Sequence, residues 1–164
     1  MKGLRDAFVL GVVLILQTAF LYRLEIGGIR PDLLVAFVVY FGWMRGPVAG
    51  SVGGFSIGLI QDLDAPGPLG LNALAKTVVG FAVAKAGFRV HRSNPGVRFF
   101  FFLLAMIAHD VIYFAALSTG DAWLFLKQMF FVALPSALYT TVVTLFLLGF
   151  AERFSRRPLL ADET

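Results

Sequence analysis

Hydrophobic residues follow one another in long runs along the whole chain, and short polar or glycine- and proline-containing segments separate the runs. Runs of this length and composition are typical of helices that cross a membrane. We expect helices at residues 7–22, 33–44, 47–61, 69–88, 99–117 and 124–150. The pattern therefore predicts an all-α polytopic membrane protein. About six transmembrane helices would form one bundle over residues 1–150, followed by a polar tail at 151–164.

Two of the expected helices, 33–44 and 47–61, are short for a membrane span. At 1.5 Å per residue the apolar part of 33–44 covers roughly 18 Å, whereas the hydrocarbon layer is about 30 Å thick. A re-entrant hairpin is one explanation, and two spans in a locally thin or tilted bundle are another. We favour the two spans. In the last run Pro135 predicts a kink, because proline interrupts helical hydrogen bonding.

A glycine recurs at every fourth position of one expected helix and the residue before it, at Gly46, Gly50, Gly54 and Gly58. A spacing of four keeps these positions on one slowly rotating face of a helix. In a membrane, such a smooth face lets another helix approach closely. No Gly-Lys-Ser/Thr sequence follows, so the glycines do not form a phosphate-binding loop. They predict a helix-packing or partner interface, formed with another helix of this chain or with a second protein.

Charged residues make up only 15% of the chain and lie mostly at the ends of the hydrophobic runs. This placement is typical of residues that orient membrane helices, so the net charge of +4 does not indicate nucleic-acid binding. With the N-terminus inside, nine basic residues fall on the inner side and three on the outer side. The inner ones are Lys2, Arg5, Arg45, Arg89, Arg92, Arg98, Arg153, Arg156 and Arg157, and the outer ones are Arg23, Arg30 and Lys127. We therefore expect both termini to be cytoplasmic.

A few polar residues fall within or at the ends of the expected spans: Asp62, Asn72, Lys76, His109 and Asp110. Ionisable groups at membrane depth either form a proton or solute path or pair with one another to fix two helices. We favour a structural ion pair between Lys76 and Asp110, because each lies about seven residues, or roughly 10 Å, from the outer end of its helix. Asp62 is a competing partner for the lysine.

The remaining candidates for chemistry are few. The chain has no cysteine, which excludes disulfides and thiolate sites. His109 has no second histidine or cysteine nearby in the sequence, and His91 falls in a basic loop. Asp62 and Asp64 fit a solvated turn better than a cation site. Because no nucleophile, base and acid are arranged together, we expect no catalytic residue, metal or cofactor, and no enzyme.

Short elements in the middle of the chain resemble, in order and spacing, those of the bacterial rod shape-determining MreD family. They are Pro31-Asp32-Leu33-Leu34, Arg45-Gly46-Pro47, Gly54-Phe55, Gly58-Leu59, Asp62 and Leu69-Gly70-Leu71-Asn72-Ala73-Leu74. The similarity covers roughly residues 30–90, and the last two expected helices match mainly in hydropathy and length.

This resemblance implies a non-enzymatic integral membrane component of the cell-elongation complex. Its expected partners are MreC and, through the complex, MreB, RodA and a class B penicillin-binding protein. The family is also similar in fold to the six-helix substrate-binding components of energy-coupling-factor transporters. That similarity supplies an alternative function, a small-molecule-binding subunit of a vitamin-type transporter. Its pocket would have to be lined by Asp62, Asp64, Asn72, Lys76 and Asp110.

Overall fold

The computed structural model describes residues 11, 13, 17, 29, 31–64, 67–87, 90 and 94–154. The expected helix at 7–22 and most of the tail at 151–164 lie outside the described residues, as do His91 and the side chain of Asp64. Within the described part the regular elements are helices: α2 (Leu33–Arg45), α3 (Pro47–Asp64), α4 (Leu71–Gly87), α5 (Pro95–Leu117), α6 (Ala122–Gln128), η3 (Met129–Ala133) and α7 (Leu134–Phe154). The last three follow one another without a break, so the described residues form five continuous helices.

The helix ends differ from the expected ones where local chemistry extends a helix. α5 begins at Pro95 rather than at residue 99, because the Asn94 side chain caps it by accepting from the backbone N–H groups of Gly96 and Val97. Pro135 was expected to kink the last helix, and the structure has the π-helical turn η3 directly before it. A wider turn there relieves the clash between a proline ring and the preceding turn of the helix.

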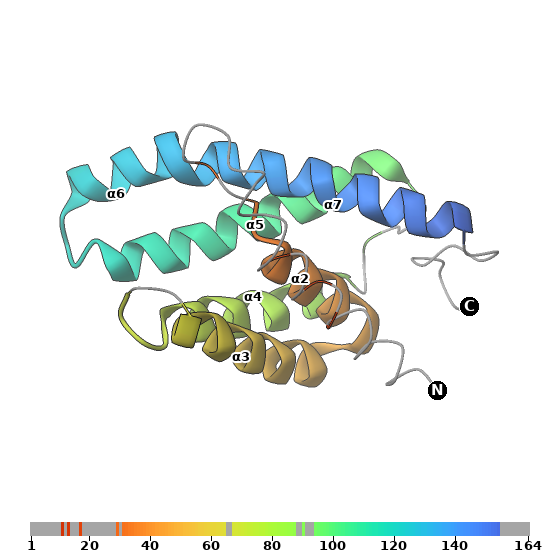
Figure 1. Ribbon diagram of the computed structural model, residues 1–164, viewed down its shortest axis with the longest axis horizontal. Coiled ribbons are helices and arrows are strands. Elements are labelled where there is room, and N and C mark those ends of the chain that lie inside the picture. The colour runs from red at the N-terminus through yellow and green to blue at the C-terminus, as the bar shows by residue number, and fades with distance from the viewer. Residues whose placement is uncertain are drawn as a thin grey trace.

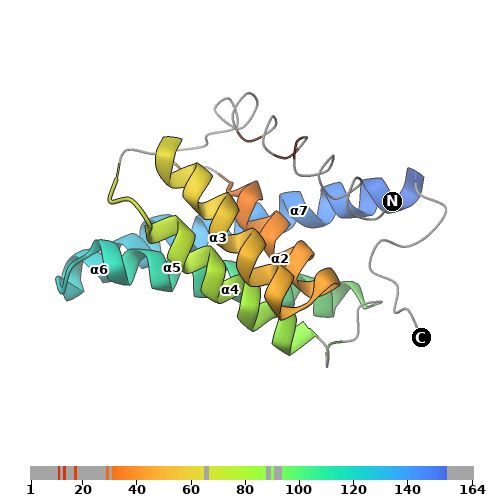
Figure 2. The same ribbon diagram turned by 90° about the horizontal axis from the view of Figure 1, so that it is seen from below.

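The helices form two layers with α2 between them (Figure 1). α3 and α4 lie side by side in one layer, and α5 forms a hairpin with the α6–α7 helix in the other (Figures 1 and 2). α2 contacts α3, α4, α5 and α7. Every residue of α2 from Leu33 to Val39 is buried, which makes this short apolar helix the centre of the described fold.

One aromatic side chain fastens the end of α2 to its neighbours. The Trp43 ring lies 4.1 Å from the Phe101 ring of α5, measured between centroids. Its Nε1–H donates to the carbonyl oxygen of Gly87, the last residue of α4, at 3.0 Å. A buried tryptophan needs such an acceptor for its N–H group. Trp43 therefore ties α2 to both layers at one end of the bundle.

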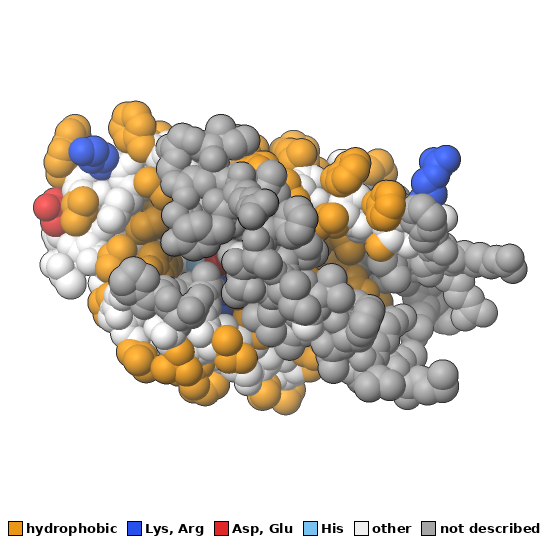
Figure 3. Space-filling model, in the orientation of Figure 1, with side chains coloured by type: hydrophobic (Ala, Val, Ile, Leu, Met, Phe, Trp, Pro, Cys, Tyr) orange, Lys and Arg blue, Asp and Glu red, His pale blue; other side chains and the backbone are white. Residues whose placement is uncertain are grey.

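Two of the described helices are long and apolar enough to cross a membrane: α5, with 23 residues, and Ala122–Arg153, with 32 residues. Leu33–Arg45 is apolar but shorter. Hydrophobic side chains cover much of the visible surface along α6–α7 and along α3 (Figure 3). Phe131 is 72% exposed and Phe146 is 71% exposed, which fits contact with lipid rather than with water.

Candidate functional site

A buried group of polar side chains lies where α2 begins, α3 ends, α4 begins and the second half of α5 passes them. We call it the polar cluster. Its members are Asp32, Gln61, Asp62, Asn72, Lys76, His109 and Asp110. The structure thus brings together all five polar residues singled out from the sequence, and it adds Asp32 and Gln61.

Lys76 lies at the centre of the polar cluster and is fully buried. Its Nζ lies 3.3 Å from Asp32 Oδ2, 3.1 Å from Asn72 Oδ1 and 3.3 Å from His109 Nε2. An ammonium group has three hydrogen atoms to donate, so these three partners use its full capacity. A buried charge is tolerated when it is paired and hydrogen-bonded in this way.

Asp32 is the anionic partner of Lys76 and also caps α2. Its Oδ1 accepts from the backbone N–H groups of Leu34 and Val35, at 2.9 and 3.1 Å. Its Oδ2 accepts from Lys76 and, at 3.2 Å, from Gln61 Nε2 of α3. Its own backbone N–H donates to Thr140 Oγ1 of α7 at 3.0 Å. One aspartate therefore joins α2 to α3, α4 and α7.

The expected ion pair between Lys76 and Asp110 is not present. Asp110 instead lies 3.0 Å from His109, between Oδ1 and Nδ1, and the other nitrogen of that histidine faces Lys76. That pair was expected because Lys76 and Asp110 lie equally far from the outer ends of their helices. The expectation left out Asp32, which follows Pro31 at the start of α2. An aspartate cap uses one oxygen for its own helix, and the second oxygen is free to face the core. That was the signal which sequence reasoning missed.

Asp62 is buried and caps the neighbouring helix α4. Its Oδ2 accepts from the N–H groups of Gly70 and Ala73, both at 3.0 Å. Its Oδ1 accepts from the backbone N–H and the side-chain amide of Asn72, at 3.1 and 3.0 Å. The positive end of the helix macrodipole favours a carboxylate at this place. The expectation of a solvated turn is therefore wrong for Asp62, which stabilises the start of α4.

The glycine face of α3 lies against α4. A Cβ atom at Gly58 would lie 2.5 Å from the Cα of Ala73, and one at Gly54 would collide with the carbonyl group of Lys76. Gly50 faces the backbone of Gly80 in the same way. Gly46 is different: it lies between α2 and α3 with φ +90°, and no atom lies within 4 Å of the added Cβ. Its role is a turn that a side chain would strain.

A further close approach of backbones involves a glycine that the spacing did not indicate. A Cβ at Gly42 of α2 would lie 2.7 Å from the carbonyl oxygen of Gly80 and 3.5 Å from the Cα of Gly50. Gly42, Gly50 and Gly80 thus meet where α2, α3 and α4 converge. Because Gly54 packs on the backbone of Lys76, the glycine face and the polar cluster form one continuous site.

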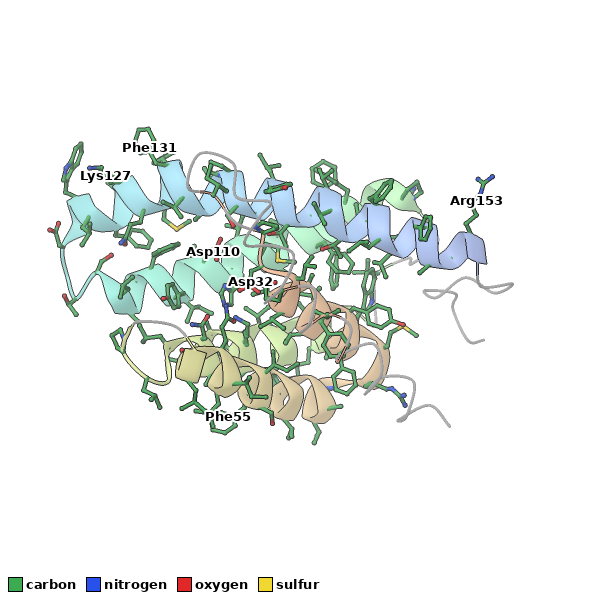
Figure 4. All side chains as sticks on the ribbon, in the orientation of Figure 1. Asp32, Phe55, Asp110, Lys127, Phe131 and Arg153 are labelled. Atoms are coloured by element: carbon green, nitrogen blue, oxygen red, sulfur yellow. The ribbon has the colours of Figure 1, made fainter. Side chains whose placement is uncertain are left out.

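The labelled side chains in Figure 4 show where the polar cluster meets the second layer. Asp110 lies on α5 and Asp32 at the start of α2, close together in the region where the two layers meet (Figure 4). Both are partly accessible, with 18% and 25% of the side chain exposed, whereas Lys76 and His109 beneath them are 0% and 5% exposed. The buried lysine and histidine thus lie below two partly exposed carboxylates.

The comparisons with known proteins now identify the family. Residues 6–157 match the family model of the rod shape-determining protein MreD. The chain belongs to the MreD family. Searches of curated proteins and of solved structures give no match.

The match to the MreD model confirms the resemblance and extends it beyond the central elements. It includes all of α5 and the α6–α7 helix, for which the sequence offered only hydropathy and length. The chain is therefore a rod shape-determining membrane protein, and its described part is all-helical. The central elements that first indicated MreD include Asp32, Gly54, Gly58, Asp62 and Asn72.

Proposed function

We propose that this protein is a non-enzymatic scaffold of the bacterial cell-elongation complex, which spans the plasma membrane several times with both termini in the cytoplasm. In this role it binds MreC and helps to organise peptidoglycan synthesis together with MreB, RodA and a class B penicillin-binding protein. Family membership supports the role in cell shape, and the uneven distribution of basic residues supports the orientation. The observation that carries the scaffold role is the internal hydrogen bonding of Lys76 and Asp62 within the polar cluster.

Lys76 and Asp62 use their hydrogen-bonding capacity on the protein itself, whereas Gln61 Oε1 of the same cluster is buried without a hydrogen-bond partner among the described residues. Lys76 donates to three acceptors, and the two oxygens of Asp62 accept four hydrogen bonds from the turn before α4 and its first residues. A site that recognises a small polar molecule needs convergent groups whose partners come from the ligand. Lys76, Asp62 and Asn72 are three of the five residues required by the vitamin-transporter alternative. Their internal bonding favours a structural core that holds four helices in fixed positions.

The faces of the bundle that point outwards suit contact with lipid and with membrane helices of partners. On α3, opposite the glycine face, Val52 is 62% exposed and Phe55 is 53% exposed. On the hairpin, Phe130 is 62% exposed and Phe146 is 71% exposed. A rigid core with apolar outer faces is the arrangement that a scaffold within the membrane needs, because partner helices associate by packing against fixed surfaces.

Co-purification from a membrane extract tests this proposal directly. The tagged protein, extracted in mild detergent, is expected to retain MreC through affinity and size-exclusion steps. An unrelated tagged membrane protein of similar size, expressed at the same level, serves as the control. Retention of an ATPase module without MreC would instead support the transporter alternative and contradict the scaffold role.

A further inference from the structure

The contacts of His109 define where its proton lies. Its Nε2 is 3.3 Å from Lys76 Nζ, and its Nδ1 is 3.0 Å from Asp110 Oδ1. A lysine ammonium group can only donate, so Nε2 must accept and carries no proton. A carboxylate can only accept, so Nδ1 must donate and carries the proton. The two neighbours therefore fix a neutral imidazole with its hydrogen on Nδ1.

We propose that His109 is a proton-sensitive latch between α4 and α5. In the neutral form it accepts a hydrogen bond from Lys76 and so joins the two helices through their buried faces. When a proton from the medium binds to Nε2, the lone pair that holds Lys76 is lost and an imidazolium cation faces the ammonium group. Lys76 keeps Asp32 and Asn72, Asp110 keeps the imidazolium, and the contact between α4 and α5 loosens.

The charged surroundings of the latch come from every helix packed around it. Within the described residues, α4 contributes Lys76, the start of α2 contributes Asp32, and α3 contributes Asp62, which acts through Asn72. α5 itself contributes Asp110 and Tyr113, whose ring lies 6.2 Å from the His109 ring between centroids. α7 supplies the uncharged Thr140 beside Asp32. The ammonium group is thus the nearest charge on one side of the ring and the Asp110 carboxylate on the other.

A proton from the medium can reach His109 by way of the partly exposed Asp110 carboxylate. The Asp110 side chain is 18% exposed although the His109 side chain is 5% exposed. Figure 3 shows acidic and histidine side-chain atoms in the middle of the visible face. A proton can therefore arrive at the edge of the polar cluster without the bundle opening. The latch concerns this chain alone and does not depend on which partner binds it.

Nitrogen NMR of the purified full-length chain in nanodiscs tests the proton assignment. The chain has two histidines, so in the His91→Gln variant the remaining histidine signal comes from His109. At neutral pH we expect a proton on Nδ1 and none on Nε2, and at acidic pH an imidazolium with both. A proton on Nε2 at neutral pH, or an imidazolium already present there, would overturn the proposal.

Spin-label distance measurements on the same sample test the movement. Because the chain has no cysteine, two can be introduced at exposed positions, at Val78 on α4 and Leu104 on α5. We expect the α4–α5 distance distribution to change with the same pH midpoint as the NMR signal. The control pair, Val52 on α3 with Val78, spans the glycine contact and should stay constant.

The His109→Gln variant completes the test, because glutamine can accept from Lys76 but does not take up a proton in this pH range. It is expected to lose the pH-dependent change between Val78 and Leu104. Titration of His109 without any change in that distance would show that it is not a latch. If His109→Gln does not fold, the two measurements on chains that keep His109 still decide the proposal.

Discussion

The two layers of this protein are held together in different ways. In the α3–α4 layer and at its contact with α2, glycines bring backbones into direct contact, and a buried lysine is paired with an aspartate. In the hairpin of α5 and the α6–α7 helix, the core is formed mainly by apolar side chains, among them Phe102, Met106 and Ala137. Only 22% of the most apolar stretch of α5 and 28% of that of α6–α7 are buried within the protein. The stability of the first layer depends on the identity of single residues, whereas the stability of the hairpin depends mainly on the hydrophobic character of its side chains.

This contrast has a physical cause. Backbone contact needs the absence of a side chain, so one added methyl group must displace a main-chain atom that cannot move aside. A buried charge needs its partner, since the unpaired ion has no water to solvate it. Apolar side chains in contact with lipid have neither requirement, because lipid tails fill the space around many shapes. The contrast predicts which substitutions this protein tolerates.

The largest effect is expected where a buried charge loses its counter-ion. Asp32→Asn keeps an oxygen that can cap α2 but removes the negative charge that pairs with Lys76. We expect the free energy of unfolding to fall by about 3 kcal/mol, the lower end for a broken buried pair, because Asp32 is 25% exposed. Unfolding of the purified protein in mixed micelles, followed by circular dichroism, measures this loss.

Asp110→Asn is the matched control for Asp32→Asn. It makes the same chemical change in a carboxylate that contacts the neutral ring of His109 rather than the lysine, and the asparagine oxygen can still accept from Nδ1. We expect a loss below about 1 kcal/mol. Equal losses in the two variants would mean that Lys76 has no preferred counter-ion, which would contradict the pairing seen here.

A smaller but clear effect is expected at the glycine contact. The added Cβ of Gly54→Ala would collide with the carbonyl group of Lys76, so the two helices must separate, at a cost of about 1–3 kcal/mol. Gly149 lies in α7 of the hairpin, with no atom within 4 Å of an added Cβ. Gly149→Ala should therefore stabilise the helix, by up to about 1 kcal/mol. The same unfolding experiment compares the two.

The two glycine variants, Gly54→Ala and Gly149→Ala, are expected to change the free energy of unfolding in opposite directions. Both variants make the same chemical change in a helix, so helix propensity favours alanine equally in each. A difference between them reports the space around the residue. If Gly54→Ala were as harmless as Gly149→Ala, the backbone contact between α3 and α4 would not exist in the membrane.

The sequence predicted the helices and the polar residues better than it predicted their partners. Hydrophobic runs locate helices because the pattern is local, and the fourfold glycine spacing is visible along α3 alone. Gly42 has no such spacing, and its role appears only when α2 meets Gly50 and Gly80. The choice of Asp32 over Asp110 likewise depends on which helix ends beside Lys76. Such contacts between distant segments cannot be derived from one sequence.

Local sequence patterns also did not predict that Asp62 caps α4. An aspartate that caps its own helix precedes it directly, as Asp32 and Asp121 do. Asp62 instead lies in the last turn of α3 and caps α4, across a turn that contains Pro68 and Gly70. Sequence reasoning therefore placed it in solvent. The acidic residue was recognised, but its burial followed from the return of the chain at that turn.

The smallest effect is expected for an ion pair that joins the helices of the hairpin near the end of α7. Arg98 Nη1 of α5 lies 3.0 Å from both carboxylate oxygens of Glu152 on α7. Their side chains are 13% and 19% exposed, so water screens the pair more than it screens the fully buried Lys76. A double-mutant cycle with Arg98→Ala and Glu152→Ala should give a coupling energy of about 0.5 kcal/mol. Raising the salt concentration should reduce it further. A coupling of several kcal/mol would show that the hairpin, like the first layer, depends on one specific pair, and the contrast between the two layers would then fail.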